Sequence, residues 1–459
     1  MTPIRFVTVL FTLVSLCLSR ELHPLASASD VAGSSTGSNN DDPSNRDESS
    51  KATRATPAST DDVKYIIWAR KGTSKEDADG FYNTLVGMVG NKDEVEFLVN
   101  DKNIPYAWLA ALTTAQLDKI RADGVVDRAE ADEQLRVERS GGTAANRRRD
   151  SVQRRPGEDK PMMDLRMLST PPQTPLLDYY GYDDSAGEGI TIYMIDSGPF
   201  AFEHSELRPL DSSVTRENID MMDRPWLVDD DSFHGTCVVS KAVGNTVGVA
   251  RRANLVTVRI DITPGKFRFI QAWEAIRDDI KSKGLRGKAV VSTSVVSTSA
   301  DRKTLEDLEE LVQSITEMDV PIITGAGNSF LEGVIEPDTF PATLAERLPV
   351  IVVGSAAPGG TMSRWSQRGR LLTTWAVGEK VQCADRNSEN GLLTKSGTSV
   401  AAPQIAGLAA YFMSHPNFRG RLRPGTVAKD MKSLIRTYSH PRARSIHYPA
   451  TAWNGFKPA

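Results

Sequence analysis

The sequence is short of cysteine. Its 459 residues include three cysteines, and Cys17 lies in an apolar N-terminal segment, so Cys237 and Cys383 remain for the folded protein. Two cysteines allow one disulfide, but sequence alone leaves open whether they meet. No group of cysteines and histidines has the ligand spacing of a zinc site. No Asn-x-Ser/Thr site for N-glycosylation occurs either.

Long apolar runs and a strong charge of one sign are also missing. Lys and Arg total 55 against 59 Asp and Glu, and this near balance argues against nucleic acid as the main partner. The apolar run from Phe6 to Leu18 follows Arg5 and is shorter than the roughly 20 residues of a membrane-spanning helix. It is typical of a secretory signal cleaved near Ser19. We therefore expect a secreted, extracellular monomer with a signal peptide at 1–19 and no membrane partner.

The composition divides the rest of the chain, which is too long for one compact core. Residues 20–62 are rich in Ser, Asp, Asn and Thr and poor in large apolar side chains, so we expect them to be disordered. Residues 137–160 are charged and rich in arginine, which predicts a basic linker where a processing protease could cut. Two ordered domains are predicted, at 63–136 and 161–459.

The first ordered domain is small and mixes helix with strand. Strands are predicted at 64–69, 95–99, 104–112 and 125–126, and a polar helix through Phe81, Leu85 and Met88 follows the first of them. Thr113 and Gln116 have the spacing of a capping box at the start of a second helix. The order β-α-β-β-α-β is that of a ferredoxin-like α+β domain.

From about residue 165 the pattern changes to alternating strands and helices. Short apolar runs at 190–195, 255–260, 288–296, 320–324 and 350–353 predict strands that are covered on both faces. Helical patterns at 269–283 and 305–318 lie between them. This alternation predicts an α/β domain with a doubly wound, mostly parallel sheet. Ligands bind such sheets at the carboxyl ends of the strands.

Three reactive side chains are predicted to stand at strand ends or helix starts. Asp196 ends a strand, His234 precedes a helix, and Ser399 follows Gly397 at the start of a buried helix. A serine is a weak nucleophile that needs a base within hydrogen-bond reach, and the base needs a group that orients it. The chain order Asp, His, Ser is the order found in subtilisin.

These motifs together resemble the subtilase family of serine endopeptidases, of the subtilisin and proteinase K type. The matching segments are Asp196-Ser197-Gly198, His234-Gly235-Thr236, the strand that ends in Ala326-Gly327-Asn328, and Gly397 through Gly407. The resemblance covers about residues 165–415. It implies a subtilisin-like fold and the hydrolysis of peptide bonds in protein or peptide substrates.

The resemblance also implies a role for each site residue. Ser399 would attack the carbonyl, His234 would transfer the proton, Asp196 would orient the histidine, and Asn328 would bind the oxyanion. The substrate-binding positions would be Ser294, Val295, Val296, Gly325, Ala326 and Gly327. We expect no cofactor and no required metal, because Asp229 to Asp231 resemble a solvated approach to His234 more than a calcium loop.

The small N-terminal domain is similar to the inhibitor-type propeptide that precedes many subtilases. By that resemblance the protein would be a self-inhibited precursor whose own propeptide occupies the cleft until it is cut away. The maturation cut is expected between about Arg139 and Pro161.

Some positions depart from the family pattern. Val296 stands where glycine is usual, Phe233 where glycine commonly precedes the histidine, and Cys237 where a second histidine is frequent. We expect Cys237 to be a buried thiol that could make the enzyme sensitive to mercurials. Two alternatives stay open: a catalytically inactive subtilase-like binding or effector protein, and an aspartic protease. The second is disfavoured because Asp196-Ser197-Gly198 has no second Asp-Ser/Thr-Gly partner in the chain.

Overall fold

The computed structural model describes residues 63–135, 162–222, 234–261, 264–297 and 302–458. The predicted signal peptide, the low-complexity segment and the basic linker lie outside the described residues, as do Phe233 and Asp229 to Asp231. Their boundaries therefore stay predictions.

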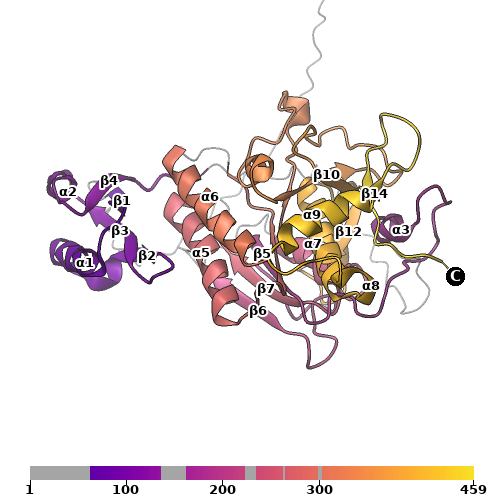
Figure 1. The fold of residues 1–459 in the computed structure, drawn as a ribbon, viewed down its shortest axis with the longest axis horizontal. Coiled ribbons are helices and arrows are strands. Elements are labelled where there is room, and N and C mark those ends of the chain that lie inside the picture. Colours follow the sequence, from indigo (N-terminus) through magenta and orange to yellow (C-terminus); the bar gives the residue numbers. More distant parts are fainter. Residues whose placement is uncertain (1–62, 136–161, 223–233, 262–263, 298–301, 459) are drawn as a thin grey trace, which may run out of the picture. The chain divides into compact units, whose positions relative to one another are not determined.

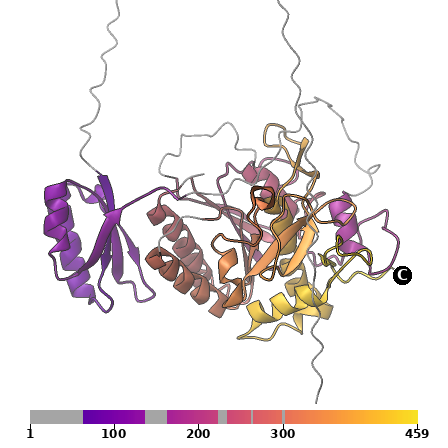
Figure 2. The ribbon, with the colours of Figure 1, turned by 90° about the horizontal axis from the view of Figure 1, so that it is seen from above.

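The small unit has the predicted element order. It consists of β1 (Val63–Ala69), α1 (Lys75–Val89), β2 (Glu96–Val99), β3 (Pro105–Leu112), α2 (Thr114–Arg121) and β4 (Val126–Ala131). The strands pair in the antiparallel order β2-β3-β1-β4, and both helices lie on one face of that sheet (Figure 2). Thr113 and Gln116 form the predicted capping box. Side chains from α1, α2 and the sheet, among them Phe81 and Trp108, form a core of their own.

The larger unit is built on a nine-stranded sheet in the order β14-β15-β11-β10-β9-β8-β5-β7-β6. Its strands are β5 (Thr191–Asp196), β6 (Arg216–Asp220), β7 (Asn254–Arg259), β8 (Ala289–Thr293), β9 (Ile322–Gly325), β10 (Ile351–Ala356), β11 (Thr374–Val377), β14 (Ser439–His440) and β15 (Thr451–Ala452). All neighbouring strands from β6 to β15 are parallel, and only β14 is antiparallel to its neighbour. The predicted fold class is confirmed.

Each central strand contributes to two cores because its side chains alternate between the two faces of the sheet. In β5, Ile192 and Met194 join one core, and Tyr193 and Ile195 join the other. All four are fully buried. This double burial is why the strands read as continuous apolar runs in the sequence.

Helices cover both faces of the sheet (Figure 1). Helices α4 (His234–Val243) and α7 (Thr398–Ser414) pack on one face, together with α3 (Met163–Ser169) and α9 (Val427–Thr437). Helices α5 (Lys266–Ser282) and α6 (Arg302–Glu317) pack side by side on the other face. A hairpin of β12 (Val381–Ala384) and β13 (Leu392–Lys395) precedes α7 in the chain, and the short α8 (Pro416–Arg419) follows α7. No helix of the described residues is long and apolar enough to cross a membrane.

Two predicted strand ends are wrong. In the small unit, the strand predicted at 125–126 extends to Ala131. The apolar run at 288–296 predicted a strand to Val296, but β8 ends at Thr293. The Thr293 hydroxyl donates to the carbonyl of Val295 (2.6 Å), and Ser297 forms an isolated bridge with Phe340 instead of continuing the parallel ladder. The pattern also missed the edge strand β6, because its mostly half-exposed or exposed side chains lack an apolar run.

Candidate active site

The nucleophile candidate lies in the first turn of α7. Ser399 is the second residue of this helix and is 5% exposed, and Gly397 forms the N-cap in an extended conformation. The unpaired N–H groups of a helix start and the positive end of the helix dipole favour an anion there. The predicted position of Ser399 at the start of a buried helix is thus the observed one.

The predicted base lies on α4, which packs beside α7 on the same face of the sheet. His234 is the first residue of α4, and its Nε2 lies 2.9 Å from Ser399 Oγ. Its Nδ1 lies 3.0 Å from each carboxylate oxygen of Asp196. With the Nδ1–H tautomer assigned from this geometry, Nε2 is the acceptor that faces the serine hydroxyl.

Asp196 is the last residue of β5 and is fully buried. Its Oδ1 also accepts a hydrogen bond from the Ser197 backbone N–H (2.9 Å). A buried carboxylate is costly unless it is paired and hydrogen-bonded, and here the imidazole and this N–H meet that need. The carboxyl end of the parallel sheet therefore carries an aspartate that can hold and stabilise a protonated imidazole.

Asn328 follows β9 and is oriented by the residue next to the serine. Its Oδ1 accepts from the Thr398 backbone N–H (2.9 Å) and from the Thr398 hydroxyl (3.2 Å). Since the carbonyl end of the amide is engaged, its NH₂ group is directed away from Thr398 and can donate to another acceptor. Thr398 was missed in the sequence, although its place beside Ser399 in the motif was a signal.

Gly325, at the end of β9, allows Thr398 to pack closely against the backbone of that strand. A Cβ atom at this position would lie 2.8 Å from the Thr398 hydroxyl oxygen, so a side chain would displace the residue that orients Asn328. The two residues that follow it also have their backbone groups engaged within the protein. The Ala326 N–H donates to Val353 O (2.9 Å), and Gly327 O accepts from the Gln367 N–H (3.0 Å).

Ser294 contacts the nucleophile's own backbone. Its hydroxyl donates to the carbonyl oxygen of Ser399 (3.3 Å). Pro403 lies inside α7, and it has no N–H to bond the carbonyl four residues earlier. That carbonyl belongs to Ser399, so Ser294 supplies the donor that the proline removes. Val295 and Val296 are both buried.

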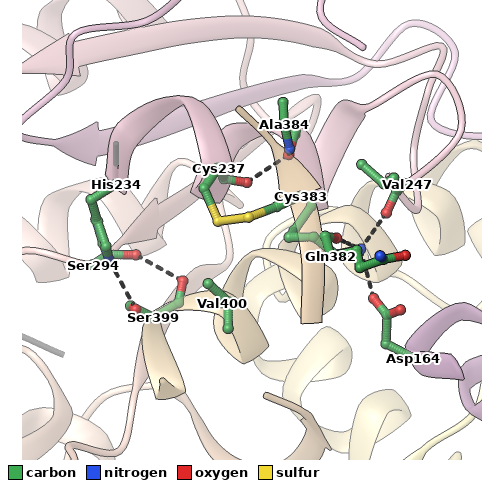
Figure 3. The surroundings of a disulfide bond; sticks show 12 residues. Asp164, His234, Cys237, Val247, Ser294, Gln382, Cys383, Ala384, Ser399 and Val400 are labelled. Atoms are coloured by element: carbon green, nitrogen blue, oxygen red, sulfur yellow. Dashed lines mark hydrogen bonds and ion pairs between the residues drawn. A yellow bond between two sulfur atoms is a disulfide. The ribbon is translucent and has the colours of Figure 1, made fainter. Parts of the chain in front are cut away.

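The two cysteines form a disulfide, Cys237–Cys383 (Figure 3). The expectation that Cys237 is a free thiol is therefore wrong, and the question of pairing is settled. The bond joins α4, one turn after His234, to β12. Spacing could not reveal it, because 146 residues separate the two partners.

A family model described as the subtilase family matches residues 187–445, more than half of the chain. The chain belongs to the subtilase family.

Relatives of this subtilase include fungal enzymes. Subtilisin-like protease 2 of Trichophyton verrucosum is 29% identical over 240 residues, 52% of this chain and 53% of that protein. Its counterpart in Arthroderma otae is 29% identical over 249 residues, 54% and 55% of the two chains. The chain thus spans about half the length of the curated relatives it matches. The crystal structure of a cold-adapted subtilisin-like serine proteinase matches the fold, with a TM-score of 0.50 and 22% identity over 66% of this chain and all of that one.

On the other face of the sheet, this subtilase binds its small unit through α5 and α6. Side chains of the small unit, including Trp68, Leu98 and Leu109, join the apolar core under these helices. Tyr106 Oη donates to Glu274 on α5 (2.9 Å). Burial raises the pKa of Glu274 to about 7, against the opposing charge of Arg277.

The last described residues of the small unit continue this contact along the start of α5. Gln134 forms an antiparallel bridge with Gly265, and the Leu135 N–H donates to Pro264 O (2.9 Å). Among the described residues no cluster of three or more His, Cys, Asp or Glu side chains has the arrangement of a metal site.

Proposed function

We propose that this subtilase is a secreted serine endopeptidase, made as a precursor that its own small N-terminal unit inhibits. The observation that carries the proposal is the single hydrogen-bonded line from Asp196 through His234 to Ser399, three residues from three different elements. Isolated hydroxyl, imidazole and carboxylate groups are common, but this line gives each of them a chemical task.

In the proposed mechanism Ser399 Oγ attacks the carbonyl carbon of the substrate while His234 Nε2 takes its proton. Asp196 holds the imidazole in the required tautomer and stabilises the imidazolium. The oxyanion accepts hydrogen bonds from the Asn328 amide and the Ser399 N–H. His234 then returns the proton to the leaving amine, and water hydrolyses the acyl-enzyme by the same route.

We assign substrate contact to the two segments that flank this line. Ser294, Val295 and Val296 follow β8, and an extended peptide laid along their backbone would gain main-chain hydrogen bonds. Gly325, Ala326 and Gly327 would act chiefly as a wall, because the Ala326 N–H and the Gly327 carbonyl are bonded inside the protein.

Labelling with a fluorophosphonate probe tests the proposal. Processed wild type should be labelled at Ser399 and should cleave casein, and Ser399→Ala should lose at least about 10⁴-fold of that activity. Ser282→Ala, at an exposed position at the end of α5, is the matched serine control and should behave like wild type. Equal casein cleavage by wild type and Ser399→Ala would favour the inactive binding or effector protein.

Self-inhibition is tested separately by N-terminal sequencing of the secreted protein. If the chain cuts itself, wild type should begin between about Arg139 and Pro161, and Ser399→Ala should retain the small unit. The contact of Gln134 and Leu135 with residues 264–265 is compatible with this, since it holds the last described residues of the small unit against the large unit. Identical N-termini in both proteins would show that another protease makes the cut.

A further inference from the structure

Helix α4 is joined to β12 by a seam of three side chains, Cys237, Ser240 and Lys241. Their spacing of three and four residues places them on one face of the helix. Cys237 bonds covalently to Cys383. The Ser240 hydroxyl accepts from the Ala384 N–H (3.0 Å).

Lys241 completes the seam as a fully buried cation. Its ammonium group donates to the carbonyls of Gln382 (3.2 Å) and Val247 (2.6 Å) and pairs with Asp164 (2.6 Å). Both side chains of that ion pair are almost inaccessible to solvent. Three successive residues of β12, 382 to 384, are therefore held by α4.

The seam connects the helix that carries His234 to the hairpin that leads into the helix of Ser399. Helix α4 begins at His234, one turn before Cys237. From β12 the chain turns into β13, which pairs with it, and then runs directly through Gly397 into the first turn of α7, where Ser399 lies. Cys237–Cys383 is thus a covalent link between the base-bearing helix and the hairpin that delivers the nucleophile.

A second contact between α4 and α7 lies at the far end of α4. Gly407 approaches so closely that a Cβ there would be 2.8 Å from Ala242 O. This contact is about two turns from His234, so it fixes the position of α4 but constrains the direction of its first turn less. In the half of the helix where the histidine lies, the Thr236 hydroxyl donates to Pro199 O (2.9 Å) and accepts from the Ala201 N–H (3.1 Å), and the disulfide is the covalent tie to the hairpin that leads to Ser399.

We propose that Cys237 and Cys383 are positioning residues for the reaction, and that their disulfide sets the alignment of His234 Nε2 with Ser399 Oγ. The inference rests on the proposed function. Proton transfer depends steeply on geometry, and a displacement of about 1 Å can cost about 100-fold in rate. Loss of the bond should therefore lower turnover in molecules that remain folded, with little change in substrate binding, because neither cysteine belongs to the segments assigned to the substrate.

The test compares wild type with two double variants, Cys237→Ala/Cys383→Ala and Cys237→Val/Cys383→Ala, of which the second refills part of the space. Active sites are counted by fluorophosphonate titration, and kcat and KM are measured on an internally quenched peptide that wild type cleaves, well below each variant's Tm. We expect kcat per titrated site to fall about tenfold or more, KM to stay within about twofold, and fluorophosphonate labelling to slow in parallel with kcat.

Two matched variants separate positioning from stability. Leu344→Ala removes a buried side chain from the core on the opposite face of the sheet, so it should lower Tm and leave kcat unchanged. Ser240→Ala removes the neighbouring seam contact alone and should lower kcat by a smaller factor than the loss of the disulfide.

A double variant with lower Tm but wild-type kcat would overturn the proposal, and so would one in which KM alone changes. Should neither double variant fold, wild type partly reduced in urea below its unfolding transition provides the measurement. Activity per folded molecule should then fall with the fraction of reduced protein and return on reoxidation. An inactive wild type would instead refute the proposed function.

Discussion

The two faces of the central sheet hold their neighbours in different ways. On the face of α4 and α7 the connections are covalent or fully buried, as in Cys237–Cys383 and the pair Lys241–Asp164. On the face of α5 and α6 the small unit is held by an apolar patch and by pairs that solvent reaches, such as Arg268–Glu96. The first set suits contacts that persist through catalysis. The second suits a unit that would have to leave in the proposed function.

The two faces differ because water can rehydrate the groups of an exposed contact when it breaks, but not those of a buried one. A buried ion or backbone group that loses its partner meets no water, so breaking the contact carries the full desolvation cost. A half-exposed pair is rehydrated when it separates, and its net contribution is small. The predictions below test whether the two faces differ in this way, and they run from the largest expected effect to the smallest.

Removing the buried cation should cause the largest change. Lys241→Met leaves Asp164 buried without its counter-charge, and we expect the free energy of unfolding to fall by roughly 3–5 kcal/mol in urea titrations. The double variant Lys241→Met/Asp164→Leu should recover most of that loss, since both charges are then absent. If Lys241→Met cost less than 1 kcal/mol, this face would be no more firmly held than the other.

Burial of Glu274 under the small unit should make the binding of that unit depend on pH. Burial raises the pKa of Glu274 to about 7 when the small unit covers it, whereas an exposed glutamate titrates near about 4.3. Protonated Glu274 therefore favours the assembly. Affinity should be constant below about pH 4, fall as the pH rises from about 4 to 7, and level off at its weakest value above that.

The measurement is the binding of labelled segment 63–135 to the processed large unit across this range, where we expect a weakening of about ten- to a hundredfold. Glu274→Gln, which mimics the neutral acid, should remove most of the pH dependence. The nearby Asp101, Asp278 and Arg277 also face this site, so an unchanged pH profile in Glu274→Gln would assign the effect to them.

Loss of the Ser294 hydroxyl should have a moderate effect on turnover. In Ser294→Ala the Ser399 carbonyl loses the hydrogen bond from Ser294, and Pro403 has no N–H to replace it. The loss of such a hydrogen bond costs about 1 kcal/mol. We expect kcat to fall about fivefold at unchanged expression and fold. Pro403→Ala restores a backbone donor, so the double variant should be closer to wild type. No recovery would mean that the hydroxyl acts on the substrate.

The pair Arg268–Glu96 should contribute less, because it is partly exposed. A double-mutant cycle with Arg268→Ala and Glu96→Ala should give a coupling energy of about 1 kcal/mol for binding of the small unit, and it should shrink at 0.5 M salt. We expect a coupling energy above zero because the guanidinium binds the carboxylate in a bidentate geometry. A coupling several times larger that ignores salt would erase the difference between the two faces.

The smallest effect is expected from thiol reagents. Cys237 and Cys383 are buried and joined, so an organomercurial should leave the activity of the processed protein unchanged. Thiol counting by mass spectrometry should find neither cysteine labelled before reduction. Inactivation with one adduct per chain would contradict the disulfide.

Local patterns predicted the small unit and the central strands of the large sheet, and they identified the candidate site residues. The apolar runs located β5, β7, β9 and β10, and the capping pattern at Thr113 located α2, because burial and capping act over a few residues. The end of β8 and the polar edge strand β6 were not predictable in this way. A side-chain contact of Thr293 decides the first, and pairing with β7 decides the second.

By itself the sequence determined the alternation of strands and helices and the order of Asp196, His234, Asn328 and Ser399, since each of these rests on local chemistry. The tertiary structure alone decided that Cys237 bonds Cys383 and that Tyr106 covers Glu274. It also decided that the Ser294 hydroxyl donates to the Ser399 carbonyl, which receives no hydrogen bond from Pro403. Each of these joins residues more than a hundred positions apart. Spacing along a chain carries no information about such distances, because they arise only when the sheet has placed its helices.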